Sequence, residues 1–316
     1  MYKIFKSIDE GITELDLSQL TKGAWIDIVS PSTEELLEIS AHTGVQLDFL
    51  TAALDDEEKS RIETETDQIL ILVDIPLLRS NNDYDTLPLG IIMTADYVIT
   101  VCLEVNAVLA DFSSLNYRFF STYKKTRFLF QILYKSATLY LKYIRNINRR
   151  TDELEQHLRK SMENEELFNL LDVQKSLTFF SASLRSNYIV TEKLLRLRSA
   201  KQVQHLVKMY EEDEDLLEDV IIEYKQAIEM VEMYSHILNS MMEVFASIIN
   251  NNMNLVMKFL AGMTIVLAIP TVLSSLWGMN VPVPLADNPY GFFIVSASAT
   301  LTAGIFAYFL WKRRMF

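Results

Sequence analysis

Glycine and proline are missing from more than half of this chain. None of the eight glycines and seven prolines lies between Gly90 and Gly262, although average usage would place about twenty in such a stretch. Both residues interrupt helices, so the interval is predicted to be helical almost throughout. The predicted helices cover about residues 118–161, 165–198 and 203–277.

Cysteine, basic charge and catalytic motifs are also scarce. Cys102 is the only cysteine, and the net charge is −13. A single cysteine excludes an internal disulfide and indicates a reducing compartment, and the acidic balance argues against a nucleic-acid partner, which requires a basic face. The sequence has no phosphate-binding loop, nucleophile elbow or dinucleotide-binding fingerprint, so neither an enzyme nor an organic cofactor is predicted. The first ten residues lack the apolar region of a signal peptide, so none is expected.

Two runs near the C-terminus lack charge altogether, at residues 259–277 and 291–311. Each has about 20 residues, the length with which an α-helix crosses the roughly 30 Å hydrocarbon core of a bilayer. Lys258 precedes the first run and a Lys-Arg-Arg sequence follows the second, whereas the loop between them has no basic residue. The positive-inside rule therefore predicts a multi-pass protein of the cell (plasma or inner) membrane with both termini in the cytoplasm.

The first hundred residues mix strand and helix signals. Ser32 and Glu35 form the pattern of a capping box that starts a helix, and Gly44 is expected to end it. A second helix is expected over residues 48–60. Segments rich in β-branched and aromatic residues predict strands at 22–30, 68–78, 89–95 and 97–104. These elements predict a small N-terminal α/β domain.

Apolar residues repeat at alternating steps of three and four along the last predicted helix. They are Leu217, Ile221, Tyr224, Ile228, Val231, Leu238, Met242, Phe245 and Ile249. A period of 3.5 indicates a helix that packs against other helices. The repeat alone leaves open whether those helices belong to the same chain.

A second stripe on this helix is small or polar at nearly every turn. Within the membrane run it comprises Asn254, Met257, Ala261, Thr264, Ala268, Thr271 and Ser275, and it continues towards the N-terminus through Asn250, Ser247, Glu243, Ser240 and His236. The opposite face is expected to meet lipid and comprises Leu255, Phe259, Val266, Ile269, Leu273 and Leu276.

This stripe has two interpretations. Small residues mark tight helix packing, whereas polar groups at membrane depth generally face a cavity or pore. Two spans cannot enclose a pore, so the second interpretation requires a cyclic homo-oligomer with one copy of the helix from each subunit around the axis. The second span would then pack outside the first through Ser296, Ala297, Thr300, Ala303, Gly304 and Ala307.

The acidic run at residues 211–215, followed by Glu218 and Asp219, fits either a solvated helical face or a site for divalent cations. The four histidines show no spacing suited to a structural zinc site.

The first span ends in Trp277-Gly278-Met279-Asn280. A Gly-Met-Asn motif at this place in an acidic protein, followed by a second span and a basic tail, resembles the CorA family of magnesium transporters. The resemblance covers the whole chain. It implies an α+β membrane protein that assembles as a homopentameric, funnel-shaped channel, with Mg²⁺ as both the transported and the regulatory ion.

The predicted organisation has seven parts. They are a cytosolic α/β domain (1–110), a cytosolic helical hairpin (111–202), the cytosolic part of a stalk helix (203–254), a first transmembrane helix ending in the motif (255–280), an external loop (281–290), a second transmembrane helix (291–311) and a basic cytosolic tail (312–316).

The resemblance also implies roles for particular residues. Gly278, Met279 and Asn280 would form the selectivity filter, in which Asn280 presents a ring of amide oxygens to a hydrated cation. The pore-lining positions would be Asn254, Met257, Leu260, Thr264, Ala268, Thr271 and Ser275, with Met257 and Leu260 as a hydrophobic gate. Glu243 would lie at the cytosolic mouth of the pore and Asp219 would bind regulatory Mg²⁺ between subunits. Lys312, Arg313 and Arg314 would form a basic ring.

The chain departs from the family pattern in four places. Trp277 replaces the tyrosine that commonly precedes the motif, Ala268 replaces a bulkier residue, and Pro270 lies one residue from the usual proline. Asp287 is the only charge of the outer loop, so electrostatic attraction of cations at the mouth is expected to be weak.

The predicted function is Mg²⁺ influx, driven by the membrane potential and gated by cytosolic Mg²⁺. Two alternatives remain, namely the same architecture carrying Zn²⁺, Co²⁺ or Ni²⁺, and a membrane-anchored coiled-coil scaffold without transport. The expected partners are further copies of the chain, membrane lipid and divalent metal ions.

Overall fold

The computed structural model describes residues 1–8, 11–79, 83–113, 120–161, 164–197, 205–285 and 288–313. The chain divides into two compact units, Met1–Asn239 (the first unit) and Ser240–Phe316 (the second unit).

The first unit contains a seven-stranded sheet with the order β2-β1-β3-β7-β6-β5-β4. β3 and β7 run parallel, whereas the other neighbouring pairs are antiparallel. The strands are β1 (Tyr2–Ile8), β2 (Gly11–Leu15), β3 (Trp25–Val29), β4 (Arg61–Thr64), β5 (Gln68–Leu78), β6 (Tyr84–Thr94) and β7 (Val98–Cys102).

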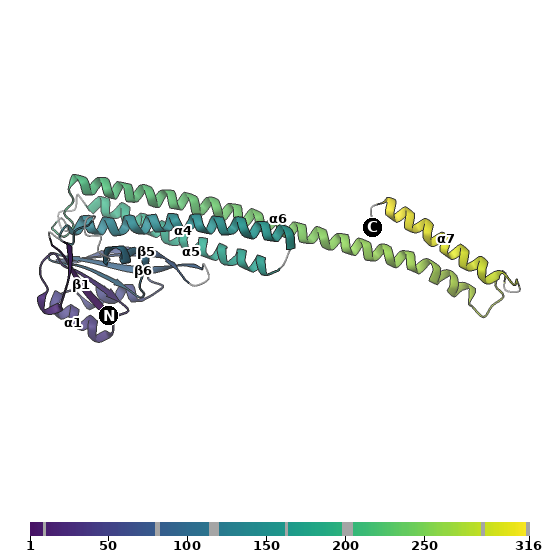
Figure 1. Cartoon of the computed structure of the whole chain (residues 1–316), viewed down its shortest axis with the longest axis horizontal. Helices are drawn as coiled ribbons and strands as arrows, with labels where there is room; N and C mark the ends of the chain where they lie inside the picture. The colour runs from purple at the N-terminus through teal and green to yellow at the C-terminus, as the bar shows by residue number, and fades with distance from the viewer. Residues whose placement is uncertain are drawn as a thin grey trace. The chain divides into compact units, whose positions relative to one another are not determined.

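Helices cover both faces of this sheet (Figure 1). The helices of the chain are α1 (Thr33–Thr43), α2 (Leu47–Thr51), α3 (Ala107–Ser113), α4 (Lys125–Ser161), α5 (Asn164–Leu197), α6 (Glu211–Trp277) and α7 (Gly291–Lys312), with short 3₁₀ turns at Leu17–Gln19 and Ala52–Leu54. On one face, α1 and α2 close a core that includes Ile26, Ile39 and Leu50. On the other, the ring of Trp25 lies 5.1 Å from that of Phe128 in α4. The alternation of side chains along each strand explains why one sheet builds two cores.

The start of α6 packs in the first unit beside α4 and α5 (Figure 1). Gln174 donates to Asn239 at 2.8 Å and Arg185 pairs with Glu232, so α6 runs antiparallel to α5. The predicted apolar repeat is confirmed as a packing face here, because Leu217, Tyr224, Val231 and Leu238 are fully buried. From Leu217 to Leu238, this face of α6 packs against helices of the same chain.

A buried polar cluster joins these helices to the sheet. Asn187 of α5 donates to the carbonyl of Asp74 at 2.6 Å and accepts from the amide of Asp74 at 2.9 Å. The same amide oxygen accepts from the hydroxyl of Ser60 at 3.0 Å, and the hydroxyl of Tyr140 in α4 donates to the Asp74 carbonyl at 3.2 Å. Burial raises the pKa of the Asp74 carboxyl, although hydrogen bonds from serines oppose the shift. The side chain of Asn187 thus replaces a missing strand neighbour for β5.

Burial also raises the pKa of Asp27, to about 6, against the opposing effect of a hydrogen bond from Thr100. The Thr100 hydroxyl donates to Asp27 at 2.8 Å and accepts from the indole of Trp25 at 2.9 Å. This chain of bonds satisfies the polar groups that β3 and β7 bury under α4.

The N-terminal predictions are largely confirmed. The capping box of Ser32 and Glu35 is present, and Gly44 ends α1 with a positive φ of 73°. The four predicted strands exist, as β3, β5, β6 and β7. Strands β1, β2 and β4 and helix α3 were not predicted.

The expected helix over residues 48–60 is wrong beyond Leu54. α2 ends at Thr51 and one 3₁₀ turn follows. The Asp55 carboxylate accepts the amide of Glu57 at 3.0 Å, which gives the backbone an alternative to the helical bond.

Two long helices begin later than predicted. α4 starts at Lys125 rather than near residue 118, because Thr122 exchanges two 3.0 Å hydrogen bonds with Ser7 of β1. α6 starts at Glu211 rather than near 203, because the Asp213 carboxylate accepts the amide of Tyr210 at 3.1 Å and caps the helix there. The predicted helix breaks near 162–164 and 199–201 fall wholly or partly outside the described residues.

The acidic run therefore has a structural role at the first turn of α6. Negative side chains are favourable near the N-terminus of a helix, and Arg127 of α4 contacts Glu212 at 3.2 Å and Asp213 at 3.7 Å. Among the described residues, no three His, Cys, Asp or Glu side chains are grouped so that they could hold a metal ion.

Replacing Asn187 by leucine is expected to lower the free energy of unfolding by about 2–4 kcal/mol, because the Asp74 amide and the Ser60 hydroxyl lose their acceptor and the Asp74 carbonyl keeps only Tyr140. Denaturant unfolding of the full-length protein in detergent, followed by circular dichroism, measures the change. Asn239→Leu is the matched control, since Asn239 is exposed and accepts a single hydrogen bond. Equal losses in the two variants would contradict the assigned role of Asn187.

Candidate functional site

The second unit contains the C-terminal part of α6 and the whole of α7. Both helices are long and apolar enough to cross a membrane. α6 continues as one helix to Trp277 despite Pro270 within it. That proline cannot donate to the carbonyl of Val266, so one backbone hydrogen bond is missing from the span. The motif follows the end of the helix instead of forming its last turn.

The predicted pore-lining residues form one uncovered face of α6. Asn254, Met257, Leu260, Thr264, Ala268, Thr271 and Ser275 are all exposed in the single chain. Gly262, Val266, Ile269, Leu273 and Trp277 are buried or half-buried instead. At about 100° per residue, these covered positions centre on the side of the helix opposite to the stripe.

The six residues expected to meet lipid divide into two groups, because Leu255, Phe259 and Leu276 are exposed whereas Val266, Ile269 and Leu273 are half-buried. Val266, Ile269 and Leu273 lie on the side that α7 covers within this unit. The apolar composition fits either environment, because a helix neighbour in a membrane is as apolar as lipid.

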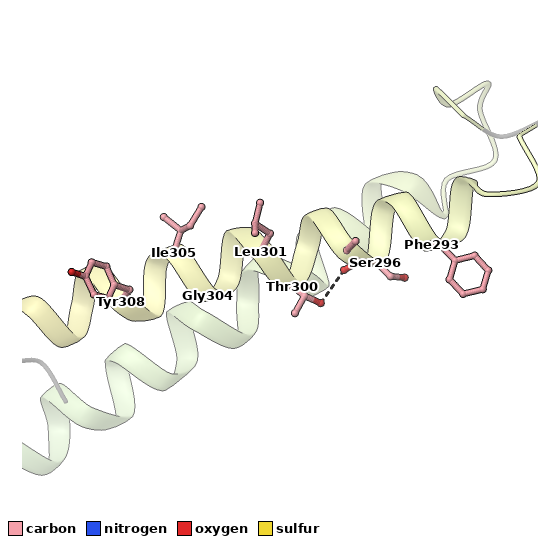
Figure 2. Close-up of a pocket in the computed structure, with 8 residues that line it drawn as sticks. Phe293, Ser296, Thr300, Leu301, Gly304, Ile305 and Tyr308 are labelled. Carbon is pink, nitrogen blue, oxygen red and sulfur yellow. Dashed lines mark hydrogen bonds between the residues drawn. The ribbon is translucent and has the colours of Figure 1, made fainter.

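The predicted packing positions of α7 also divide into two groups. Ala303 and Ala307 are half-buried, and Ala299 between the predicted positions is 5% exposed. Ser296, Thr300 and Gly304 instead line an open groove with Ala297 (Figure 2). The Thr300 hydroxyl donates to the carbonyl of Ser296 at 2.9 Å, so its hydrogen is satisfied within the helix.

Two threonine hydroxyls on the stripe of α6 also donate to carbonyls of their own helix. Thr264 donates to the carbonyl of Leu260 at 2.8 Å, and Thr271 donates to that of Leu267 at 3.0 Å. Each hydroxyl hydrogen is thereby engaged, and the oxygen lone pairs remain available on the uncovered side. The stripe can therefore accept hydrogen bonds at Thr264 and Thr271.

The Gly-Met-Asn motif lies directly after α6. The amide of Gly278 donates to the carbonyl of Ser274 at 2.9 Å, and Met279 is 53% exposed. The φ of Gly278 is not positive, and a Cβ there would lie 3.2 Å from the Ser274 carbonyl oxygen.

The loop after the motif folds back onto the end of α6. The indole Nε1 of Trp277 donates to the carbonyl of Pro284 at 3.0 Å. Gly291, the first residue of α7, lies against the same indole. Sequence reasoning missed this contact, although the change of the usual tyrosine to Trp277 was a signal. Asp287 lies outside the described residues.

The remaining predicted site residues are scattered over the helices. Asp219 and Glu243 are both exposed on α6, in the first and second unit respectively. Lys312 ends α7, and the guanidinium of Arg313 lies 5.2 Å from the ring centre of Phe309. Arg314 lies outside the described residues. Within the second unit, the structure thus joins the stripe directly to the motif.

Comparison with known proteins identifies the family of the chain. Residues 21–314 match the family model described as CorA-like Mg2+ transporter protein. The cobalt/magnesium transport protein CorA of Methanocaldococcus jannaschii is 31% identical over 294 residues, which cover 90% of this chain and 88% of that protein.

Solved structures lead to the same family. The complete structure of the CorA magnesium transporter of Methanocaldococcus jannaschii is 27% identical, covers 98% of this chain and 96% of its own, and superposes with a TM-score of 0.82. The cytoplasmic domain of ZntB from Vibrio parahaemolyticus is 13% identical, covers 79% of this chain and 96% of its own, and has a TM-score of 0.60. Because the identity is only 13%, the similarity to the ZntB domain shows a shared fold and nothing more.

The predicted resemblance is confirmed, and with it the prediction that the protein is a membrane transporter and not an enzyme. By sequence match and by structure, the chain belongs to the family of CorA-like Mg²⁺ transporter proteins.

Proposed function

We propose that copies of this chain, five by resemblance to the family, assemble around the stripe of α6 and form a channel for Mg²⁺ influx. The observation that carries this proposal is the uncovered stripe that leads to the motif on the side of α6 opposite to α7. Polar groups at membrane depth need polar partners. A ring of such helices supplies them as a water-filled path, with lipid outside α7.

The chemistry of the stripe suits a hydrated divalent cation. Mg²⁺ demands octahedral oxygen geometry at about 2.0–2.1 Å and releases its water reluctantly. Amide oxygens of Asn280 at the entrance can accept hydrogen bonds from that water without displacing it. The oxygens of Thr264 and Thr271 offer the same acceptors along the path, because their hydrogens are engaged elsewhere.

The membrane potential supplies the driving force. A divalent ion gains about 4–5 kcal/mol on crossing an inside-negative potential of roughly 100 mV. Both termini would lie in the cytoplasm, so the entrance at the motif faces outwards. Glu243 would then attract the ion at the cytosolic mouth, where Lys312, Arg313 and Arg314 surround the neck of the pore.

Cytosolic Mg²⁺ would regulate the path through Asp219. Its exposed carboxylate in the first unit is free to share a cation with an acidic residue of a neighbouring copy. Losing that cation would restore repulsion between like charges and separate the subunits. Met257 and Leu260, which are 61% and 53% exposed on α6, would then cease to form a dry constriction and would admit water.

Co²⁺ is the second candidate ion, because the relative from Methanocaldococcus jannaschii is named as a cobalt/magnesium transport protein. Zn²⁺ and Ni²⁺ remain further alternatives on the same architecture. The scaffold without transport is the more distant alternative, and it gives no role to the polar residues of the stripe.

Replacing Asn280 by alanine is expected to reduce Mg²⁺ uptake by about tenfold or more, because every subunit loses its amide oxygen at the entrance. Uptake is measured in proteoliposomes with a Mg²⁺-sensitive dye and an imposed inside-negative potential. Asn251→Ala is the matched control, since Asn251 is exposed on α6 but lies off the stripe. Unchanged uptake in Asn280→Ala would favour the scaffold.

Replacing Asp219 by alanine is expected to raise the internal Mg²⁺ concentration needed for half-inhibition by about fivefold or more, while the uninhibited rate stays the same. Glu218→Ala serves as the control, because Glu218 is the adjacent exposed carboxylate on another side of the helix. The same inhibition curve in Asp219→Ala and wild type would remove Asp219 from the sensor.

Hexaamminecobalt is expected to inhibit uptake competitively, because its inert ammine shell resembles hydrated Mg²⁺ and the entrance binds intact shells. Inhibition is measured in the same vesicles at several Mg²⁺ concentrations. Uptake of Zn²⁺ or Ni²⁺ that is insensitive to this complex would instead indicate a path that binds partly dehydrated ions.

A further inference from the structure

We propose that Trp277 is a positioning residue for the Gly-Met-Asn motif. Through its hydrogen bond to Pro284 and its contact with Gly291, it would fix the segment that places Asn280 at the entrance. We name this group of Trp277, Pro284, Leu285 and Gly291 the indole clasp. The inference rests on the proposed function, because it concerns how the filter of that channel is held.

The motif itself has little support within the chain. α6 ends at Trp277, and the Gly278 amide makes the last bond to the helix, 2.9 Å from the Ser274 carbonyl. In the part of the chain that the structure describes, no hydrogen bond reaches residues 279–283. The position of this short segment therefore depends on what holds its two ends.

The indole holds the far end. Nε1 of Trp277 donates to the Pro284 carbonyl at 3.0 Å, which joins residues seven positions apart. Pro282 and Pro284 have φ fixed near −65°, so the segment between the two attachments has few conformations left. A half-buried ring at the end of α6 thus sets the path of the five residues that follow Gly278.

The absence of a side chain at position 291 completes the clasp. A Cβ there would lie 3.3 Å from Cζ2 of Trp277 and would overlap the carbonyl oxygen of Leu285. Leu285 accepts the amide of Asn288 at 3.2 Å, and Asn288 accepts that of Gly291 at 2.8 Å. Any larger residue at 291 must displace this turn and, with it, the loop that the indole holds.

An ordinary membrane anchor does not need these contacts. Tryptophan is common at membrane interfaces, where the amphipathic ring meets the lipid headgroups. That role predicts that phenylalanine or an altered loop changes stability at most. The clasp predicts a change in how the entrance captures an ion.

The first test compares Trp277→Phe with wild type. This variant keeps an aromatic ring and removes the donor to Pro284. Mg²⁺ uptake into proteoliposomes is measured over a range of external Mg²⁺ concentrations at a fixed potential. The apparent KM is expected to rise about five- to tenfold, the size of effect that one net hydrogen bond supports, while the maximal rate stays within about twofold.

The second test changes Gly291, the residue that lies against the Trp277 indole. Gly291→Ala is expected to raise the apparent KM to a similar extent, and the double variant should show less than the product of the two effects, because both changes disrupt one contact. Gly304→Ala is the matched control, since a Cβ at that position of the same helix meets nothing within 4 Å.

The outcomes separate the clasp from the proposed function. Wild-type KM in both Trp277→Phe and Gly291→Ala overturns the clasp and leaves transport intact. A lower maximal rate at unchanged KM also overturns it, because a general loss of structure then explains both variants. Absence of any ion uptake by folded wild-type protein overturns the proposed function and the clasp together.

Discussion

A polar group inside a membrane must find a partner, and this constraint shapes the second unit. α7 covers only the apolar side of α6, where Val266, Ile269 and Leu273 lie. The other side carries Asn254, Thr264 and other small or polar residues with nothing over them in the single chain. Hydrocarbon cannot solvate those groups. A further copy of the chain against the stripe of α6, as proposed above, would supply the partners that one copy lacks.

The first unit meets a similar demand in a different way. There, the bundle of α4, α5 and α6 lies over a sheet whose strands bury polar backbone, and the partners come from inside the chain. Asn187 bonds to both backbone groups of Asp74, and Tyr140 adds a third bond. These bonds connect α4 and α5 to β5, and the start of α6 packs beside the same two helices.

Much of this arrangement could be predicted because the signals are local. An uncharged run of sufficient length identifies each span, and the capping box of α1 needs only Ser32 and Glu35. The stripe follows from a repeat along a single helix. The start of α4 could not be predicted in this way, because it depends on a bond between Thr122 and Ser7, which are 115 positions apart. β1 is interrupted by lysines and β4 has four residues, so neither has a clear apolar alternation.

In the candidate site, too, features with a local sequence signal could be predicted and contacts between separate segments could not. Spacing along the helix predicts the stripe, and the family resemblance adds Leu260, whereas the opposite side of α6 was expected to meet lipid. Composition cannot separate these two environments, since both are apolar. The contact between Trp277 and Pro284 was missed because a loop has no period from which its path can be read. Loops of this kind are positioned by single bonds, and those bonds appear only in the structure.

The orientation of the threonine hydroxyls has a consequence for the sign of the ions that such a path admits. Thr264 and Thr271 have given their hydrogens to carbonyls of their own helix, so their outward side offers electron pairs and no donors. An anion needs donors and would find none from these residues, whereas the water around a cation points its hydrogens outwards. Discrimination of this kind uses no fixed charge, and residues 259–277 contain no group that titrates near neutral pH. The preference for positive ions would therefore persist across changes in pH that would disable a ring of carboxylates.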